Sequence, residues 1–155
     1  MGADIYRRSI SDAARKQYLP LFDEAVKKRN AGDETAREDV EKYYRAMYPE
    51  DGYFRDSYNN SNFLWLLGIS WWRDIKTDEN GFLSIDRAKA FLATLEEKPV
   101  TQELVEAHIA KLNEKERRIE PDVDGWFDRW TKDREHLMKM LRDSIESDEM
   151  LYCSL

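Results

Sequence analysis

Apolar side chains recur every three or four residues in five separate segments of the chain, which is the spacing of an amphipathic helix. These segments cover residues 14–26, 36–47, 85–95, 104–112 and 123–145. A shorter apolar run at residues 63–67 fits one or two more turns of helix. The pattern predicts a mainly α protein, a compact bundle of about five or six helices that forms a single domain over residues 1–155.

Capping and breaking residues suggest where these helices begin and end. Ser11, Ser84 and Thr101 each precede an apolar stripe, as N-cap residues do. Gly32 is a plausible stop for the first helix. Pro20 interrupts the first stripe, so we expect either a kink or a fresh start there.

The two ends of the chain predict a small β pairing. The segment around Ile5 and the tail around Tyr152 both suit short strands, and a lone strand is not stable in water. We therefore expect these segments to pair as two strands, and a sheet of four or more strands would contradict this expectation. Residues 82 and 83, which follow an Asn-Gly turn, can pair briefly as well.

The helical stripes also predict which side chains form the core. Ten side chains from different helices are expected to meet there: Phe22, Val40, Tyr44, Leu66, Phe91, Leu92, Ile109, Trp130, Leu137 and Leu141. Asp133 and Arg134 replace one turn of the last stripe. We expect Asp133 on its solvent side and the Arg134 stem along the core edge, with the charged head in water.

Charge and composition narrow the class of protein. The 155 residues contain 25 Lys and Arg against 32 Asp and Glu, a formal net charge of −7. This acidity, without a basic stripe, counts against direct nucleic-acid binding. No apolar run reaches the roughly 20 residues of a membrane helix, and no secretion signal follows Met1. We therefore expect an acidic, cytoplasmic protein that does not enter a membrane.

One segment has the outline of a calcium-binding loop. Asp78 and Asn80 stand at two ligand positions of KTDENGFLSIDR, but Lys76 and Arg87 occupy the first and last, which should carry carboxylates. We therefore expect no metal site here, and calcium should leave the melting temperature unchanged. Glycine motifs for nucleotide cofactors are absent, so no cofactor is expected.

The two histidines and the single cysteine have structural interpretations. His108 and His136 fall on different predicted helices and flank apolar stripes, which favours a place at the helix boundary over metal ligation. Cys153 lies in an apolar tail, so we expect a small packed hydrophobe rather than a nucleophile.

A central segment carries the most unusual chemistry. It combines aromatic rings, Arg–Asp neighbours and amides in what we expect to be loops or short helices. Such a mixture suits a pocket, in which rings stack on a planar ligand and arginine contacts an anion. The same residues can instead brace the fold, with Arg55 paired to Asp56 or Asp74. The candidate residues for binding a ligand or partner are Tyr53, Arg55, Asp56, Tyr58, Asn59, Trp71, Trp72, Arg73 and Asp74.

Four strings in the chain carry a resemblance. MGADIY, GYFRDSYN, LGISWW and YCSL resemble a family of small uncharacterised proteins from bacteria and their phages. The resemblance implies a cytoplasmic bacterial or phage-infected setting and an accessory gene. It implies no catalytic residue.

Two classes of function remain open. The first is a non-enzymatic binding or interaction protein of the phage or mobile-element accessory type, which binds a protein partner or a small anionic ligand. The second is a small enzyme or sensor that acts on a nucleotide or another phosphorylated ligand. In it, Arg55 or Arg73 would clamp the anion and Asp56 or Asp74 would act as general base. An enzyme needs a carboxylate that is desolvated but not held in a structural ion pair, which distinguishes the two classes.

Overall fold

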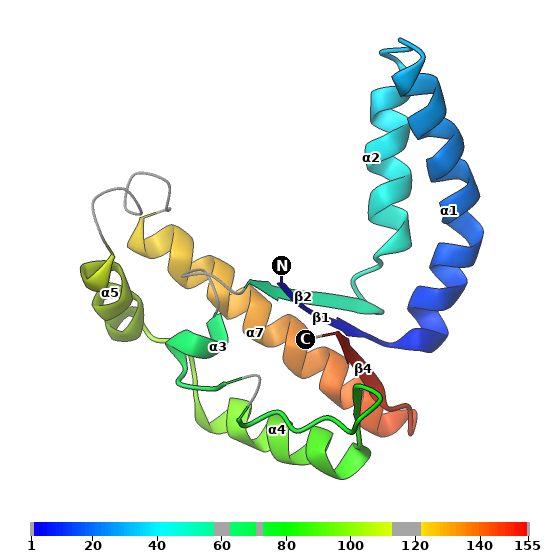
Figure 1. The fold of residues 1–155 in the computed structure, drawn as a ribbon. Helices are drawn as coiled ribbons and strands as arrows, with labels where there is room; N and C mark the ends of the chain where they lie inside the picture. The colour runs from blue at the N-terminus through cyan, green and yellow to red at the C-terminus, as the bar shows by residue number, and fades with distance from the viewer. Residues whose placement is uncertain (1, 58–62, 71–72, 113–121, 155) are drawn as a thin grey trace.

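The protein combines helices with one small antiparallel sheet (Figure 1). The computed structural model describes residues 2–57, 63–70, 73–112 and 122–154. Within them are six helices, which confirms a mainly helical fold. The helices are α1 (Arg8–Asn30), α2 (Ala36–Met47), α3 (Phe63–Leu66), α4 (Ile85–Glu97), α5 (Gln102–Lys111) and α7 (Val123–Glu146). The strands are β1 (Gly2–Tyr6), β2 (Tyr53–Ser57), β3 (Phe82–Leu83) and β4 (Leu151–Ser154).

The two ends of the chain pair as expected. Strand β1 runs antiparallel to β4, with Ile5 opposite Cys153 and Tyr6 opposite Tyr152. The limit to two strands was wrong, because the sheet has four strands in the order β2-β1-β4-β3. Strand β2 occupies the other edge of β1, where Ile5 faces Phe54.

Strand β2 was overlooked because its alternation is unusual. Phe54 and Asp56 point to the buried side and are 2% and 3% exposed, whereas Tyr53 and Arg55 point to the open side. A charged residue on the inner face and an aromatic residue on the outer face hide the apolar–polar pattern that usually indicates a strand.

The core lies between one face of the sheet and α7. Ile5, Phe54 and Leu83 from the strands are buried in the same cluster as Trp126 and Trp130. Four of the ten predicted core residues are buried in this cluster and three more pack against it half-buried: Phe91, Trp130, Leu137 and Leu141, then Leu66, Leu92 and Ile109.

The other three predicted core residues belong to a separate hairpin of α1 and α2, which projects away from the sheet (Figure 1). Val40 is buried there and Phe22 is half-buried. The prediction for Tyr44 was wrong, because its side chain is 48% exposed. A stripe on one of two projecting helices covers only its neighbour, so an aromatic residue at the edge of that stripe stays in solvent.

Helix α1 differs in two ways from its predicted form. It begins at Arg8, so Ser11 is not its cap but a buried residue of its second turn. It also continues through Pro20 as one helix. Gly32, with a φ of +96°, follows its end as expected.

Helices α4 and α5 begin at the predicted caps. The Ser84 hydroxyl accepts a hydrogen bond from the Arg87 amide, and the Thr101 hydroxyl accepts one from the Leu104 amide. The end of α4 is capped by Arg134, whose Nη2 donates to the Leu95 carbonyl at 2.6 Å. The expected solvated head of Arg134 was wrong, because the guanidinium instead donates to a carbonyl of the last turn of α4, which also accepts the Lys98 amide.

The turn before α4 is held by its own side chains. Asp78 Oδ1 accepts hydrogen bonds from the amides of Asn80 and Phe82, at 2.9 and 2.8 Å. Arg87 donates to the Lys76 carbonyl.

In the described ranges, no group of three or more His, Cys, Asp or Glu side chains is arranged to hold a metal ion. No helix in these ranges is both long and apolar enough to cross a membrane.

Candidate functional site

The sheet face that points away from α7 carries a row of four aromatic rings. Tyr53, Tyr6, Tyr152 and Phe82 stand side by side on β2, β1, β4 and β3, because the register pairs them directly. Neighbouring ring centroids lie 5.2, 6.1 and 5.4 Å apart. All four side chains are half-buried, so each ring keeps part of its surface open.

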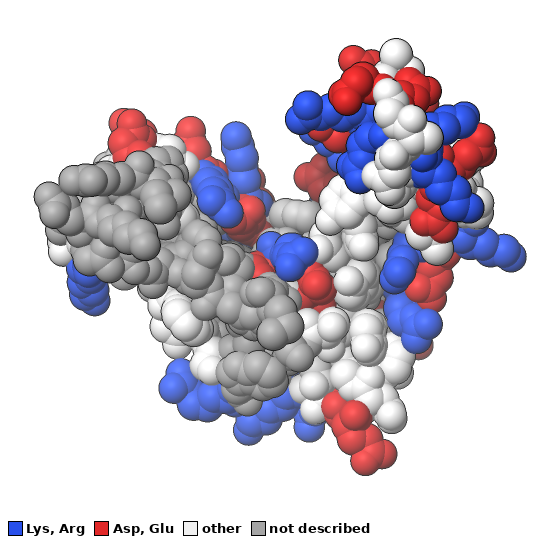
Figure 2. Space-filling view, turned by 45° about the horizontal axis from the view of Figure 1, so that its top comes forward, with Lys and Arg blue, Asp and Glu red and all other residues white. Residues whose placement is uncertain are grey.

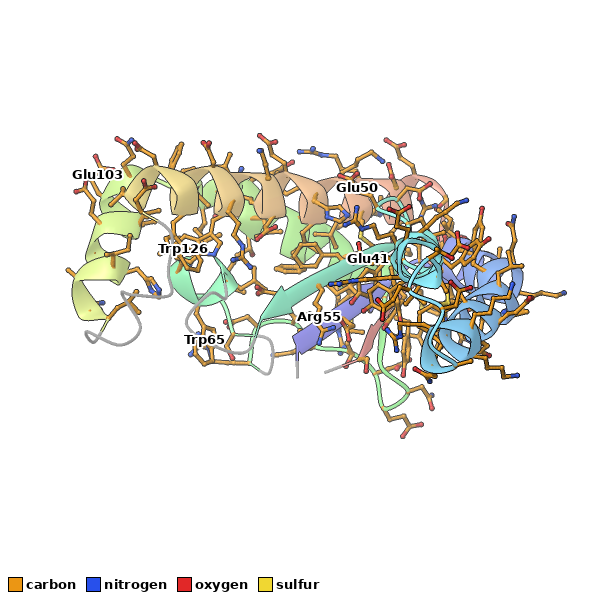
Figure 3. All side chains as sticks on the ribbon, turned by 90° about the horizontal axis from the view of Figure 1, so that it is seen from above. Glu41, Glu50, Arg55, Trp65, Glu103 and Trp126 are labelled. Carbon is orange, nitrogen blue, oxygen red and sulfur yellow. The ribbon has the colours of Figure 1, made fainter. Side chains whose placement is uncertain are left out.

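A second, polar row lies beside the rings. Asp4 on β1 stands opposite Arg55 on β2 and Ser154 on β4, two positions from the aromatic row and on the same face. Asp4 Oδ1 lies 3.6 Å from Arg55 Nε and accepts a hydrogen bond of 2.7 Å from the Tyr53 hydroxyl. Figure 3 shows Arg55 on the side of the sheet away from α7.

A pocket of about 390 Å³ opens over this face. Its walls come from the first turns of α1, the turn before β3 and the open face of β1 and β4. The pocket is lined by Tyr6, Arg8, Asp12, Arg15, Asn80, Phe82, Tyr152 and Ser154.

The cations of the pocket lie on one face of α1. The Arg8 guanidinium lies 5.8 Å from the centre of the Tyr152 ring and is bonded to Asp12 at 3.0 Å. Arg15, two turns along the helix from Arg8, makes no ion pair among the residues that the structure describes. Arg15 therefore offers a cation that no carboxylate of the described part neutralises.

The aromatic row continues onto the hairpin. The Tyr48 ring, just after α2, lies 4.7 Å from that of Tyr53, and the Tyr44 ring lies 5.1 Å from that of Tyr48. Figure 2 shows largely uncharged surface at the foot of the hairpin, within the hollow between the hairpin and the rest of the molecule. The rings thus form a floor on the sheet and a wall on the hairpin.

Two hydroxyls of this surface stay protonated at neutral pH, because their surroundings raise their pKa values. Burial raises the pKa of Tyr53, and its hydrogen bond to Asp4 raises it further. Burial and Asp4 also raise the pKa of Tyr6, while Arg15 and Arg55 oppose that rise. Tyr6 thus shares its pocket with Arg15 of α1, and it pairs with the strand that carries Arg55.

The local charge differs from that of the whole chain. Three arginines, Arg8, Arg15 and Arg55, face two aspartates, Asp4 and Asp12, whereas the chain has a net charge of −7. An acidic protein thus presents a net positive patch beside stacked rings.

The structure brings together only part of the site that the sequence nominated. Tyr53 and Arg55 lie on the open face, but Asp56 lies on the buried face of the same strand. Arg55 pairs with Asp4 rather than with Asp56 or Asp74, and its side chain is 51% exposed, so the alternative of a buried brace was wrong. Four candidates lie outside the described residues: Tyr58, Asn59, Trp71 and Trp72.

Arg73 and Asp74 form a separate pair. Two nitrogens of Arg73 each lie 3.0 Å from an oxygen of Asp74. Asp74 Oδ2 also accepts a hydrogen bond of 2.7 Å from the Ser70 amide. The hydrogen bonds from Arg73 and Ser70 lower the pKa of Asp74. No hydrogen bond or ion pair of the described residues joins this pair to Tyr53 or Arg55. The pair lines another pocket, of about 440 Å³, together with Lys76 and Lys98.

The two histidines and the cysteine each pack against neighbouring groups of the fold. His136 Nε2 lies 2.6 Å from the Glu50 carbonyl, and the ring meets Phe54 edge-on. The His108 ring packs 5.1 Å from that of Trp130. Cys153 is buried as expected, and burial raises its pKa to about 12. A thiol with this pKa is a poor nucleophile at neutral pH.

Sequence reasoning missed Asp4, Tyr6 and Tyr152, although a signal existed. Both terminal strands had been predicted, and alternation places Asp4 and Tyr6 on one face of β1, as it does Tyr152 and Ser154 on β4. The arginines of α1 carried no such signal, because only the tertiary fold places that helix beside the sheet.

No protein family model, curated protein or solved structure matches the chain.

Proposed function

We propose that this chain is a non-enzymatic binding protein that takes a planar, anionic small ligand on the open face of its sheet. One observation carries the proposal: four half-buried rings stand in a row across the sheet, with arginines on both sides. Aromatic faces stack on planar groups, and guanidinium binds phosphate or carboxylate in bidentate fashion. A concave surface with both properties suits a small ligand.

The charges on this face support binding over catalysis. A general base must be desolvated and free to take a proton. Asp4 is held by Arg55 and Tyr53, and Asp12 is held by Arg8. The raised pKa values of Tyr6 and Tyr53 keep both phenols neutral. The Tyr53 hydroxyl already donates to Asp4, so the Tyr6 hydroxyl is the one that can donate a hydrogen bond to a ligand.

The proposal keeps the setting expected from the sequence. We infer a cytoplasmic accessory protein of bacterial or phage type that recognises a small anion rather than nucleic acid or a membrane. The concave form of the pocket and its unneutralised Arg15 favour a small anion over a protein partner.

A thermal-shift screen tests this function. The panel contains nucleoside monophosphates, flavin mononucleotide and aromatic carboxylates, and a ligand that binds the folded state raises the melting temperature. We expect Arg55→Ala to lower the affinity for any hit about tenfold, because a charge-assisted contact is worth about 1.5 kcal/mol or more. Arg73→Ala is the matched control, since Arg73 is also exposed and paired with one aspartate.

Stability and affinity are measured on the same variants. Arg55 is half exposed, so its loss should change the free energy of unfolding by less than about 1 kcal/mol. If no member of the panel binds, or if Arg55→Ala and Arg73→Ala bind the hit equally well, the proposed function is wrong. Strong destabilisation by Arg55→Ala would assign that side chain a structural role instead.

A further inference from the structure

The aromatic row contains two separate places for a ring to stack. Tyr152 and Phe82 form one, here the β4 subsite, and Tyr53 and Tyr48 form the other, here the β2 subsite. Strands β4 and β2 flank β1 on opposite sides. Since neighbouring strands are about 4.8 Å apart, the two subsites are separated by about 10 Å. One base cannot cover both.

The centre of the row is polar. Tyr6 lies between the subsites and lines the same pocket as Arg15 of α1. Arg55 stands on the neighbouring strand β2, two residues from Tyr53, the partner of Tyr6. Arg15 makes no ion pair in the described part of the chain, and Arg55 is half exposed. An anionic group above Tyr6 could therefore contact an arginine on each side and accept a hydrogen bond from the phenol.

We propose that the ligand is a dinucleotide, with two bases joined through phosphate. One base stacks at the β4 subsite and the other at the β2 subsite. The linking phosphate lies over Tyr6, between Arg15 and Arg55. This inference rests on the proposed function, because it uses the same open face of the sheet, and it adds the number of rings and the position of the anion.

A free dinucleotide fits this surface better than a long nucleic-acid strand. The row ends at the turn of Asn80 and Phe82 on one side and at the hairpin wall of Tyr44 and Tyr48 on the other. The chain carries a net charge of −7, which opposes the approach of a polyanion.

The decisive measurement compares one base with two. Calorimetry measures the affinities of ApA, CpC, GpG and UpU beside those of the four nucleoside 5′-monophosphates. We expect the best dinucleotide to bind at least about tenfold more tightly than its mononucleotide, because a second stacked base adds about 1–3 kcal/mol. If the best dinucleotide and its mononucleotide bind with equal affinity, the ligand is not a dinucleotide. The proposed function would be unaffected by that result.

Longer strands distinguish a free dinucleotide from a segment of nucleic acid. Ten-nucleotide strands of the same base should bind no more tightly per site than the dinucleotide. Tighter binding with a steep dependence on salt would overturn the proposal in favour of a single-stranded nucleic acid. Absence of binding by every nucleotide, together with a hit among the flavin or carboxylate probes, would also overturn it while keeping the proposed function.

Matched variants assign the parts of the site. Arg15→Gln should weaken dinucleotide binding about tenfold, whereas Lys16→Gln, the same charge change one residue away on exposed α1, should leave it unchanged. Tyr53→Leu should reduce dinucleotide affinity to that of the mononucleotide. If Tyr53→Leu fails to fold by circular dichroism, the Arg15 and Lys16 pair decides. If Arg15→Gln and Lys16→Gln bind the dinucleotide with equal affinity, the position proposed for the phosphate is wrong.

Discussion

Arg7 Nε donates to Glu149 Oε2 at 3.3 Å and so ties the residue before α1 to the turn after α7. Nη2 of the same guanidinium donates to the Ser147 hydroxyl, also at 3.3 Å. The Arg7 side chain is only 13% exposed, and its amide donates to the Gly52 carbonyl at 3.0 Å. These bonds anchor the start of α1, the helix that carries Arg15, to the end of α7 and to Gly52 before β2.

Replacing Arg7 should therefore destabilise the protein. Arg7→Met keeps most of the stem but leaves the carboxylate of Glu149 without its cation, and we expect a loss of about 2 kcal/mol in the free energy of unfolding. Urea denaturation followed by circular dichroism measures it. Arg8→Met is the control, since Arg8 forms an exposed ion pair with Asp12, worth at most about 1 kcal/mol. Equal losses in both variants would contradict a special role for Arg7.

The same contact predicts a dependence of stability on pH. Burial alone would raise the pKa of Glu149, but hydrogen bonds from Ser9 and the charge of Arg7 outweigh it, and the pKa lies below its ordinary 4.5. A lowered carboxyl pKa stabilises the fold above the unfolded-state pKa, and that contribution disappears as the pH falls through the folded-state value. Between pH 6 and pH 3, the wild type should lose more stability than Glu149→Gln. Parallel pH profiles of the two proteins would refute this.

Arg134 should stabilise the end of α4 through its carbonyl contacts. Its Nε and Nη2 bind the Leu95 carbonyl at 3.1 and 2.6 Å, and Nε also lies 3.1 Å from the Lys98 carbonyl. Arg134→Met removes the guanidinium donors from both carbonyls and leaves the Leu95 carbonyl with the Lys98 amide, so we expect a loss of about 1–3 kcal/mol in unfolding free energy. Arg142→Met removes only an exposed ion pair to Glu96 from the same helix and should cost less than about 1 kcal/mol. The ranking of the two variants checks the prediction.

Cys153 should resist thiol reagents until the protein unfolds. It is buried in the sheet, and burial raises its pKa to about 12, so little thiolate exists at pH 8. The rate of reaction with a disulfide reagent at pH 8 should be at least about a hundredfold lower in the folded protein than in guanidinium chloride. The chain has one cysteine, so the absorbance reports this site alone. A fast reaction in the folded state would show that the thiol is accessible.

The sequence determined most of the local structure. Periodicity located the long helices, and the side chains of Ser84 and Thr101 began two of them where predicted. These features depend on residues within a few positions of one another, which a single sequence displays directly. The pairing of the chain ends followed from the same logic, since short apolar termini need a partner strand.

The candidate site was decided by tertiary structure. Asp4, Tyr6 and Tyr152 lie at opposite ends of the sequence but meet on one sheet face through strand register. Arg15 lines the pocket over that face because α1 follows β1 directly, with its start anchored by Arg7 to Glu149. Asp56 was nominated for the site but is buried on the other face of β2, since successive residues of a strand point to opposite sides. Sequence specified which side chains exist, and the long-range pairing of strands determined which of them share a surface.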